Sequence, residues 1–488
     1  MGVRVLLIWP NSRNEVLGWG DLGAIAEPLA LEYLAAALGQ AGHEAHILDL
    51  RLHPDSLTET VAAFDPHLVG VTAFSMHVRR AREIAAEVKR LHPAVRTIVG
   101  GHHATFLPED FFTPTIDYVV SGEGTTLITS VADALDRGNA VPDPAPGLYQ
   151  REEGADGSAD GATDRLWAPF DGFGRNKVGE QAFRQLPRPD RTLTAADRHR
   201  YFIDAMKPIA LMRTTSGCPY RCTFCSIWRA MDGHYYIQDT DAVVEELASL
   251  EEDNVFLVDD EAFINGKRMI ALAEAIQRAG IRKSYFTYCR IDTLLRNREA
   301  IAAWRDIGLR RLFVGIDAIS AKDLNEYRKN CDIAQVEQGL AMARELDIEI
   351  FAQFVVNTDY TKSDFKALVR FIEHNRIDYP SFTVLTPLPG TELLTDDCVI
   401  YRGEDGRPNW DLFDCQNAVT ETRLKADAFR HEYRNLYRVF KGAYTQYREH
   451  NVIVQELSAA DALATGHPTS AMRAGRGNLD RAVSGSPS

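Results

Sequence analysis

Apolar and polar residues alternate along the first 140 residues in an order of strand-like and helix-like segments. The run VRVLLIW is continuously apolar, as in a buried parallel strand, and HEAHILDL, LVGVTAFS, RTIVGG and IDYVVSGEG follow it. Helical periodicity occupies the segments between them, such as PLALEYLAAALGQAG and HVRRAREIAAEVKRLH. Strands separated by crossover helices predict an α/β fold, with a doubly wound parallel sheet over residues 1–140.

A second alternating region covers residues 196–395. Its predicted strands are IALMRTTS, NVFLVDD, SYFTYCRID, RRLFVGIDA, IEIFAQFVVN and SFTVLTPLPG. Helical segments such as DAVVEELASL and RMIALAEAIQRAG stand between them. Strand–helix units in this number predict a partial (β/α)6 barrel of the TIM type, whose functional residues gather at the carboxyl ends of the strands.

The other segments lack this alternation. Residues 141–195 are rich in Gly, Pro, Asp and Ser, which predicts a linker with one exposed hairpin. Residues 396–460 are expected to form a C-terminal helical segment. Residues 461–488 show no periodicity and are expected to be a disordered tail.

Composition narrows the function classes. The chain has 488 residues, 45% of them hydrophobic, and a net charge of −15, which argues against general nucleic-acid binding. Its 7 cysteines are an odd number without regular spacing, which favours a reducing cytosol over a disulfide framework. The start MGVRVLLIWPNS suits a buried strand better than a signal peptide. No stretch approaches the roughly 20 apolar residues of a membrane span, so we expect a cytoplasmic protein.

Three cysteines stand close together after the first barrel strand, in the stretch SGCPYRCTFCSIW. These are Cys218, Cys222 and Cys225. A structural zinc ion would need four ligands, and His234 is the only neighbour that could complete such a set. A [4Fe–4S] cluster on three thiolates instead leaves one iron open, which can bind the amino and carboxylate groups of S-adenosylmethionine (SAM). The position at a barrel mouth favours the cluster.

The spacing C-x3-C-x2-C, with Phe224 before the last cysteine, resembles the signature of radical SAM enzymes. The preceding sheet, with GGHHAT and DYVVSGEG, resembles the cobalamin-binding domain of the B12-dependent branch of that family. Within the branch, CSIWRAMDGHYY, FVVNTDYTKSDF and FTVLTPLPGTELL look most like the hopanoid C-3 methylases. The resemblance covers most of the chain.

The resemblance implies a corrin beyond the strand ends of the first sheet. The cobalt-ligating Asp-x-His-x-x-Gly motif is absent, so Met76 and His77 become candidates to approach the lower face of the corrin. The alternative for His77 is a solvent-facing loop position. The usual GEGE sequence reads GEGT here, with Thr125 in the last place. The expected cobalamin-binding residues are Thr72, Ser75, Met76, His77, Gly100, Gly101, His102, Gly122, Glu123 and Gly124.

The resemblance also implies a grip on SAM at the barrel strand ends. Asp259 or Asp260 would bind the amine, and these neighbours should face opposite sides, with a helix N-cap as the role of the other. The remaining expected contacts are Phe224 beside the cluster, Arg290 for the carboxylate, Asp317 for the ribose and Gln353 for cofactor or substrate. Asp317 stands where the family has a glutamate. A structural pair of Arg290 with Asp292, and a core amide for Gln353, are the alternatives.

The resemblance finally implies an activity. One SAM would be cleaved to a 5′-deoxyadenosyl radical that takes hydrogen from an unactivated carbon, methylcobalamin would supply the methyl group, and a second SAM would remethylate the cobalt. An electron-donor protein of flavodoxin or ferredoxin type is implied. Ring rearrangement or cyclisation without methyl transfer is the alternative. An RNA methylthiotransferase would need a second cysteine cluster, and a cobalamin-sensing regulator would have no use for the cysteine loop.

A stripe of aromatic residues with helical spacing follows the barrel. One interpretation is packing against the barrel. The other is a cover over the barrel mouth for a large apolar substrate such as a polycyclic lipid, with the flanking basic residues on an anionic membrane surface. The aromatic residues are Phe429, Tyr433, Tyr437, Phe440, Tyr444 and Tyr447, and the basic ones are Arg430, Arg434, Arg438 and Lys441.

Overall fold

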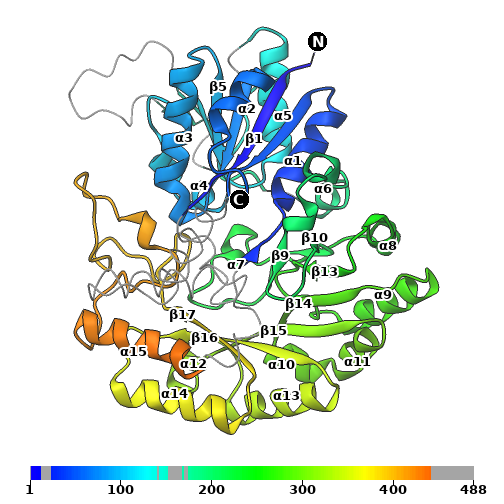
Figure 1. Cartoon of the computed structure of the whole chain (residues 1–488), viewed down its shortest axis with the longest axis vertical. Coiled ribbons are helices and arrows are strands. Elements are labelled where there is room, and N and C mark those ends of the chain that lie inside the picture. The colour runs from blue at the N-terminus through cyan, green and yellow to red at the C-terminus, as the bar shows by residue number, and fades with distance from the viewer. Residues whose placement is uncertain are drawn as a thin grey trace, which may run out of the picture.

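The computed structural model describes residues 2–12, 24–139, 142–151, 167–169, 174–177 and 179–440. It contains two α/β units, an N-terminal one drawn at the top of Figure 1 and a barrel-like one below it. The predicted residues Tyr444, Tyr447 and Lys441 and the predicted tail 461–488 lie outside the described residues. Within the described part of the chain, no helix is both long and apolar enough to cross a bilayer.

The N-terminal unit is built on a seven-stranded sheet of order β3-β1-β4-β5-β6-β7-β8. The five predicted strands are confirmed and run parallel, because each is followed by a crossover helix or turn that returns the chain to the same edge. Their bounds are β1 Arg4–Trp9, β3 Glu44–Asp49, β4 Leu68–Thr72, β5 Arg96–Gly100 and β6 Tyr118–Val120.

Helices cover both faces of this sheet, as its continuous apolar strands require. One face packs against α1 Leu29–Gln40 and α5 Thr125–Asp136, and the other against α2 Leu57–Phe64 and α3 Val78–Leu91. The short α4 His102–Phe106 and the 3₁₀ turns η2 Ser75–His77 and η3 Pro108–Phe111 follow the strand ends.

The exposed hairpin predicted within 141–195 is instead the edge of the first sheet. β7 Leu148–Arg151 pairs antiparallel with β6, and β8 Trp167–Pro169 pairs antiparallel with β7. Leu148 and Tyr149 are buried, since they pack with the helices of the sheet. After α6 Glu180–Arg184, the chain passes through η5 Arg191–Thr194 and η6 Arg198–Arg200 to β9 Phe202–Ile203, which pairs with β2 Ala24–Ile25.

The six predicted barrel strands are confirmed and form one parallel sheet in chain order, open between β10 and β17. They are β10 Ile209–Met212, β13 Asn254–Leu257, β14 Ser284–Arg290, β15 Leu309–Asp317, β16 Glu349–Val356 and β17 Tyr379–Val384. Helices pack on the outer face: α8 Thr240–Ser249, α9 Gly266–Arg278, α10 Ile291–Arg296, α11 Arg298–Asp306, α13 Ile333–Glu345 and α14 Lys362–His374. The short α12 Ala321–Glu326 packs separately, in a cluster that holds Leu324, Tyr327 and Phe224.

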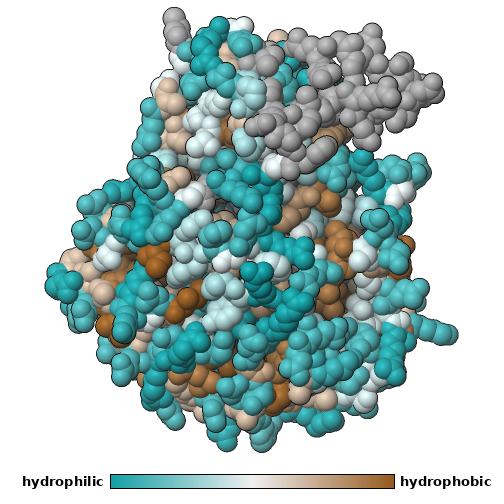
Figure 2. All heavy atoms as spheres, turned by 180° about the vertical axis from the view of Figure 1, so that it is seen from behind, coloured by the Kyte–Doolittle hydropathy of each residue, from teal (hydrophilic) through white to brown (hydrophobic). Residues whose placement is uncertain are grey.

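The helical segment predicted for 396–460 is wrong for residues 396–425. This strap has only the 3₁₀ turn η7 Trp410–Leu412, because Gly403, Gly406 and Pro408 interrupt any helix. Its apolar side chains pack on the N-terminal unit instead. The described helix is α15 Ala426–Val439, which lies beside α14 (Figure 1). On the face seen in Figure 2, hydrophilic residues predominate and the hydrophobic ones lie in small patches.

Candidate active site

The loop that carries the three cysteines follows β10 and is held by acids from the end of β13. The Asp259 carboxylate accepts the backbone N–H groups of Thr214 and Thr215 at 2.6 and 2.8 Å, and Asp260 accepts that of Gly217 at 2.7 Å. Both acids therefore contact one loop, because β13 ends at Leu257 and strand alternation no longer applies to them. The helix-cap role expected for one of them is wrong, since α9 has Asn265 as its N-cap.

Gly217 lies at a tight turn of this loop. Its φ is +87°, and a Cβ there would stand 2.2 Å from the carbonyl oxygen of His234. The approach is close because β11 Thr215–Ser216 pairs antiparallel with β12 Tyr236–Ile237, on the far side of the cysteines. A glycine is thus required where the chain enters the cysteine loop.

The three cysteines lie at the barrel mouth, and none is in a disulfide. Cys222 is buried, and its Sγ accepts a hydrogen bond from Arg290 Nη1 at 3.2 Å. Burial raises the pKa of the Cys218 thiol to about 12 and that of Cys225 to about 11. In the absence of iron these thiols stay protonated, so binding a cluster must displace their protons.

The zinc alternative has no fourth ligand here. His234 is exposed, its Nδ1 lies 3.0 Å from the Met231 carbonyl, and its ring stacks on Tyr236. Within the described ranges, no three His, Cys, Asp or Glu side chains are grouped as ligands of one ion. A [4Fe–4S] cluster is larger than a single ion and holds its thiolates further apart, so three separate thiols in a buried loop fit it.

The residues expected to grip SAM surround this loop. Arg290 pairs with Asp292 at 2.8 Å, as the structural alternative held, and also donates to the Lys329 carbonyl at 2.5 Å. Asp317 has a φ of +65° and pairs with Lys329. Gln353 donates to Thr383 Oγ1 at 2.9 Å. Phe224 packs edge-on against Tyr327, with ring centroids 5.2 Å apart. Their roles toward SAM remain predictions.

Two buried titratable residues of the site escaped the sequence analysis. Glu261 Oε2 accepts the backbone N–H of Arg290 at 2.8 Å, whereas Oε1 has no hydrogen-bond partner in the described structure. Burial raises the pKa of Glu261 to about 8. Lys329 is buried and its ammonium pairs with Asp317. Glu261 directly follows two marked aspartates and could have been noticed, but Lys329 follows a helix and carries no strand-end signal.

The carboxyl ends of the first sheet enclose a cavity of about 280 Å³ between α1 and α5. Its walls are mostly apolar, with Leu31, Leu34 and Ile128 among them, which fits an aromatic base such as the nucleotide tail of cobalamin. Six of the predicted cobalamin-binding residues line it: Thr72, Gly100, Gly101, Gly122, Glu123 and Gly124.

Two of these glycines serve the chain's own packing. A Cβ on Gly101 would stand 2.7 Å from the Ala73 nitrogen, and one on Gly122 would stand 2.2 Å from the Asn176 oxygen, and both have positive φ. Neighbouring backbone therefore approaches closely at these two positions, and their contact with cobalamin stays a prediction. Glu123 accepts the Thr125 N–H at 2.7 Å at the start of α5, so the GEGT variation leaves this turn intact.

The structure buries His77, one of the two candidates for the corrin's lower face, and leaves the role of Met76 a prediction. The His77 ring is fully buried, accepts the Phe74 N–H at 3.3 Å on Nδ1, and lies where η2 meets η7. The solvent-facing alternative is therefore wrong as well. Ser75 is also buried, with its hydroxyl 3.0 Å from His103 Nδ1, and Met76 is half-buried. The strap 396–425 covers this turn, which the sequence pattern could not reveal.

The exposed surface at these strand ends is aromatic. Phe74 is 40% exposed, packs beside Trp9 and stacks on His102 with centroids 6.1 Å apart. His102 Nε2 lies 2.9 Å from the hydroxyl of Ser226, the residue after Cys225. Burial lowers the pKa of His102 to about 4, so this ring is neutral at physiological pH. The strand ends of the N-terminal unit thus meet the cysteine loop directly.

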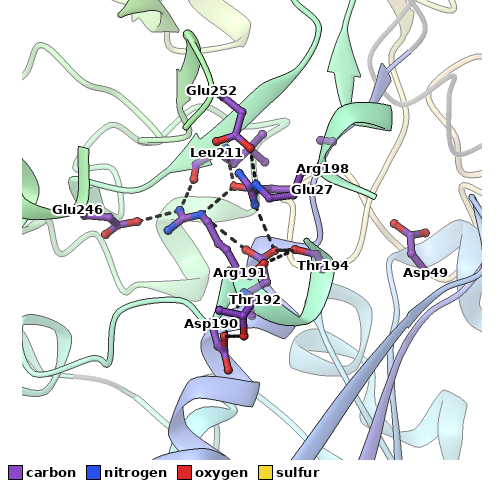
Figure 3. Close-up of polar contacts among 12 residues, drawn as sticks. Glu27, Asp49, Asp190, Arg191, Thr192, Thr194, Arg198, Leu211, Glu246 and Glu252 are labelled. Carbon is purple, nitrogen blue, oxygen red and sulfur yellow. Dashed lines mark hydrogen bonds and ion pairs between the residues drawn. The ribbon is translucent and has the colours of Figure 1, made fainter. Parts of the chain in front are cut away.

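A buried ion-pair network fixes the two units against each other (Figure 3). Arg191 and Arg198, from η5 and η6, reach Glu27 before α1, at 3.5 and 2.6 Å. Arg191 also pairs with Glu246 of α8 at 2.8 Å, and Arg198 pairs with Glu252 before β13. The network therefore joins the N-terminal unit, the connecting segment and the barrel, and it sets the distance between the two strand-end surfaces.

Comparison with known proteins agrees with both halves of this site. Residues 19–132 match the B12 binding domain and residues 212–372 match the radical SAM superfamily. The chain is 31% identical to hopanoid C-3 methylase of Methylococcus capsulatus, over 83% of this chain and 74% of that protein. It is 25% identical to the anaerobic magnesium-protoporphyrin IX monomethyl ester cyclase of Rubrivivax gelatinosus, over 81% and 70%.

The fold is similar to that of the radical SAM methyltransferase TsrM from Kitasatospora setae, solved with cobalamin and a [4Fe–4S] cluster bound. The TM-score is 0.61 at 21% identity, and the match covers 80% of this chain and 77% of that one.

Proposed function

The chain belongs to the cobalamin-dependent radical SAM methyltransferases, and from this premise we propose that it methylates an unactivated carbon of an apolar, polycyclic, lipid-like molecule. The observation that carries the proposal is the contact between His102 and Ser226 at 2.9 Å. It brings the cobalamin-binding strand ends against the cysteine loop, so a methyl donor and a radical source can face one substrate.

When bound, SAM with the [4Fe–4S] cluster supplies a carbon radical and cobalamin supplies the methyl group. Cys218, Cys222 and Cys225 would hold the cluster. The cavity lined by Thr72, Gly100 and Gly124 would hold the nucleotide tail of cobalamin. The protein contributes the relative position of these groups and the exclusion of water from the space between them.

We assign the grip on SAM to buried groups around the cysteine loop. The unpartnered Oε1 of Glu261, beside Asp260, suits the amino group. Arg290 suits the carboxylate, because it already reaches the sulfur of Cys222. Asp317, which pairs with Lys329, suits the ribose hydroxyls. Gln353 is left for the adenine or the substrate.

The inner wall of the barrel supports an apolar substrate. Some of its strand-end polar groups already pair with one another, as Arg290 does with Asp292. The face opposite the helices carries aromatic side chains that contact one another in a series: Phe286, Phe256, Tyr288, Phe313 and Phe351. A wall with few unengaged polar groups recognises carbon skeletons by shape.

The test uses SAM with a deuterated methyl group, the reconstituted enzyme and polycyclic lipids as substrates. We expect product that carries the deuterated methyl, together with 5′-deoxyadenosine. Turnover that yields 5′-deoxyadenosine and a product of unchanged carbon count would assign the chain to ring cyclisation, the activity in the name of the second relative above.

Such a substrate lies in membranes, and we propose a peripheral contact at the strap and α15. Ile400, Tyr401 and Val439 are 46%, 37% and 44% exposed, and Arg430 and Arg438 are exposed near them. Exposed apolar side chains beside cations suit an anionic bilayer surface. In flotation with anionic vesicles we expect the protein to rise with the lipid, and Ile400→Asp with Tyr401→Asp to stay behind. An intact protein that ignores these vesicles would overturn the contact.

A further inference from the structure

Trp228 links the most buried cysteine of the loop to the protein surface. It lies on α7 Ile227–Ala230, three residues after Cys225, and is half-buried. Its indole N–H donates to the carbonyl oxygen of Cys222 at 3.1 Å. A conjugated ring therefore contacts the backbone of a cluster ligand on one side and reaches the protein surface on the other.

Two arginines flank this ring. The guanidinium carbons of Arg221 and Arg229 lie 5.2 and 5.0 Å from the ring centroid. Arg221 is exposed, and the Arg229 side chain is 39% exposed. Both are thus in cation–π contact with Trp228 and still present charge to the solvent.

Further cations continue the surface on either side. Arg175 and Lys177 lie 3.2 and 2.6 Å from the Asp232 carboxylate, next to Gly233 and close to the Arg221 guanidinium. Arg328 pairs with Glu392 at 2.8 Å, and Arg229 lies 3.7 Å from the same carboxylate. We call the set the Trp228 patch: Trp228, Arg175, Lys177, Arg221, Arg229, Arg328, Asp232 and Glu392.

The patch is cationic in an acidic protein. It holds five cations against two carboxylates, which is a net charge of +3, whereas the whole chain carries −15. Charge of one sign gathered against the overall field steers a partner of opposite charge to that place. An extended polyanion such as RNA would meet the repulsion of the remaining surface, so a compact acidic protein suits the patch better.

We propose that the Trp228 patch is the docking surface for an acidic one-electron donor protein of flavodoxin or ferredoxin type. The inference rests on the proposed function, since it assumes a cluster on Cys218, Cys222 and Cys225. One electron passes from the donor's redox centre, which is oxidised, to the cluster, which is reduced, and no bond or proton is transferred. Trp228 shortens the gap between the two centres, and the arginines orient the donor.

The test measures cluster reduction by a bacterial flavodoxin hydroquinone in stopped flow, together with flavodoxin binding, for Arg221→Glu and Lys177→Glu. At low ionic strength we expect each variant to lose about tenfold in the bimolecular rate, and the difference to shrink as salt is added. Arg278→Glu is the matched control, because this exposed arginine lies on α9, away from the patch. SAM cleavage driven by dithionite should stay unchanged in all three.

Equal flavodoxin rates and affinities in wild type and both variants would overturn the docking surface. Equally tight binding of single-stranded RNA, lost in the same variants, would do so too. Lys177 lies outside the cysteine loop. If Arg221→Glu loses iron, the flavodoxin rate and affinity of Lys177→Glu alone test the docking surface. A wild type that binds flavodoxin at the patch but fails to cleave SAM with dithionite would contradict the proposed function instead.

Discussion

At the scale of the residue, three consecutive acids differ in their hydrogen bonds and in their pKa values because their surroundings differ. Asp259 is saturated, since Thr214 Oγ1 donates to its second oxygen at 2.6 Å in addition to the two backbone bonds. Burial raises the pKa of Asp260 to about 6 and that of Glu261 to about 8. Asp259 thus anchors the cysteine loop, whereas Glu261 keeps an oxygen available for a cation.

The cysteine loop yields a residue-scale prediction. We expect Cys218→Ala, Cys222→Ala and Cys225→Ala each to lose the cluster and all SAM cleavage, because three thiolates leave no ligand to spare. Cobalamin should still bind, since its cavity lies in the other unit. Iron content, 5′-deoxyadenosine and cobalamin absorbance measure the three properties. Cys398→Ala, in the strap, serves as the control, and full cluster content in any of the three loop variants would refute the ligand set.

The sequence predicted those features of the fold and the site that depend on residues close together in the chain. Strand periodicity, the C-x3-C-x2-C spacing and strand-end residues such as Arg290 and Asp317 are local patterns, and the structure brings them to one barrel mouth. The contact of His102 with Ser226 joins positions 124 residues apart, and no local pattern encodes it. The burial of His77 under the strap likewise depends on a segment far along the chain.

At the scale of the element, α15 closes the open edge of the barrel. β17 is the last strand of the sheet, so its outer backbone groups need partners. The Phe382 carbonyl has the hydroxyls of Tyr433 and Tyr437 at 2.9 and 2.8 Å, and the Val384 N–H donates to the Cys415 carbonyl at 2.7 Å. The described part of the aromatic stripe therefore packs on the barrel, as the simpler interpretation held.

This arrangement predicts that the effects of two substitutions on the free energy of unfolding are not additive. In Tyr433→Phe or Tyr437→Phe, the remaining hydroxyl still bonds Phe382, so each should lower the free energy of unfolding by only about 1 kcal/mol. The double variant leaves the carbonyl with the longer bond from Gln416 Nε2, at 3.3 Å, and should cost more than the sum. Urea unfolding measures this, with Tyr401→Phe as an exposed control. If the variants raise the substrate KM at unchanged stability, the stripe covers the substrate instead.

At the scale of the whole molecule, the described residues join the two units in several places, and three of them involve polar or aromatic side chains. These are the ion-pair network of Figure 3, the contact of His102 with Ser226, and the strap, where Arg407 pairs with Asp110 at 3.0 Å and Trp410 packs on His103. These contacts hold the strand ends of the two units in a fixed relation.

The ion-pair network of Figure 3 contains more carboxyl groups than arginines. The carboxylates of Glu27, Glu32, Glu246 and Glu252 face two arginines, and Glu32 Oε2 has no hydrogen-bond partner among the described groups. Burial, and then the neighbouring Glu27, raise the pKa of Glu32 to about 8. The folded protein therefore keeps a proton on this carboxyl at neutral pH, which the unfolded chain would release.

The last prediction is the pH dependence that follows. A carboxyl with a raised pKa in the folded state binds more protons there than in the unfolded state, so its contribution is present below about pH 4.5 and is lost as the pH rises toward about 8. The other titratable groups that face Glu32 are Glu27, Arg191, Arg198 and Tyr201, with Thr194 bonded to it at 2.6 Å. Glu32→Gln keeps the bond from Thr194 and cannot ionise. In urea unfolding we expect the free energy of unfolding of this variant to match or fall below that of wild type near pH 6 and to exceed it near pH 9, since one unit of pKa is worth about 1.4 kcal/mol.

Glu245→Gln, exposed on α8, is the control and should show no such crossing. Parallel curves for Glu32→Gln and wild type would mean that the network holds its charge without a proton on Glu32.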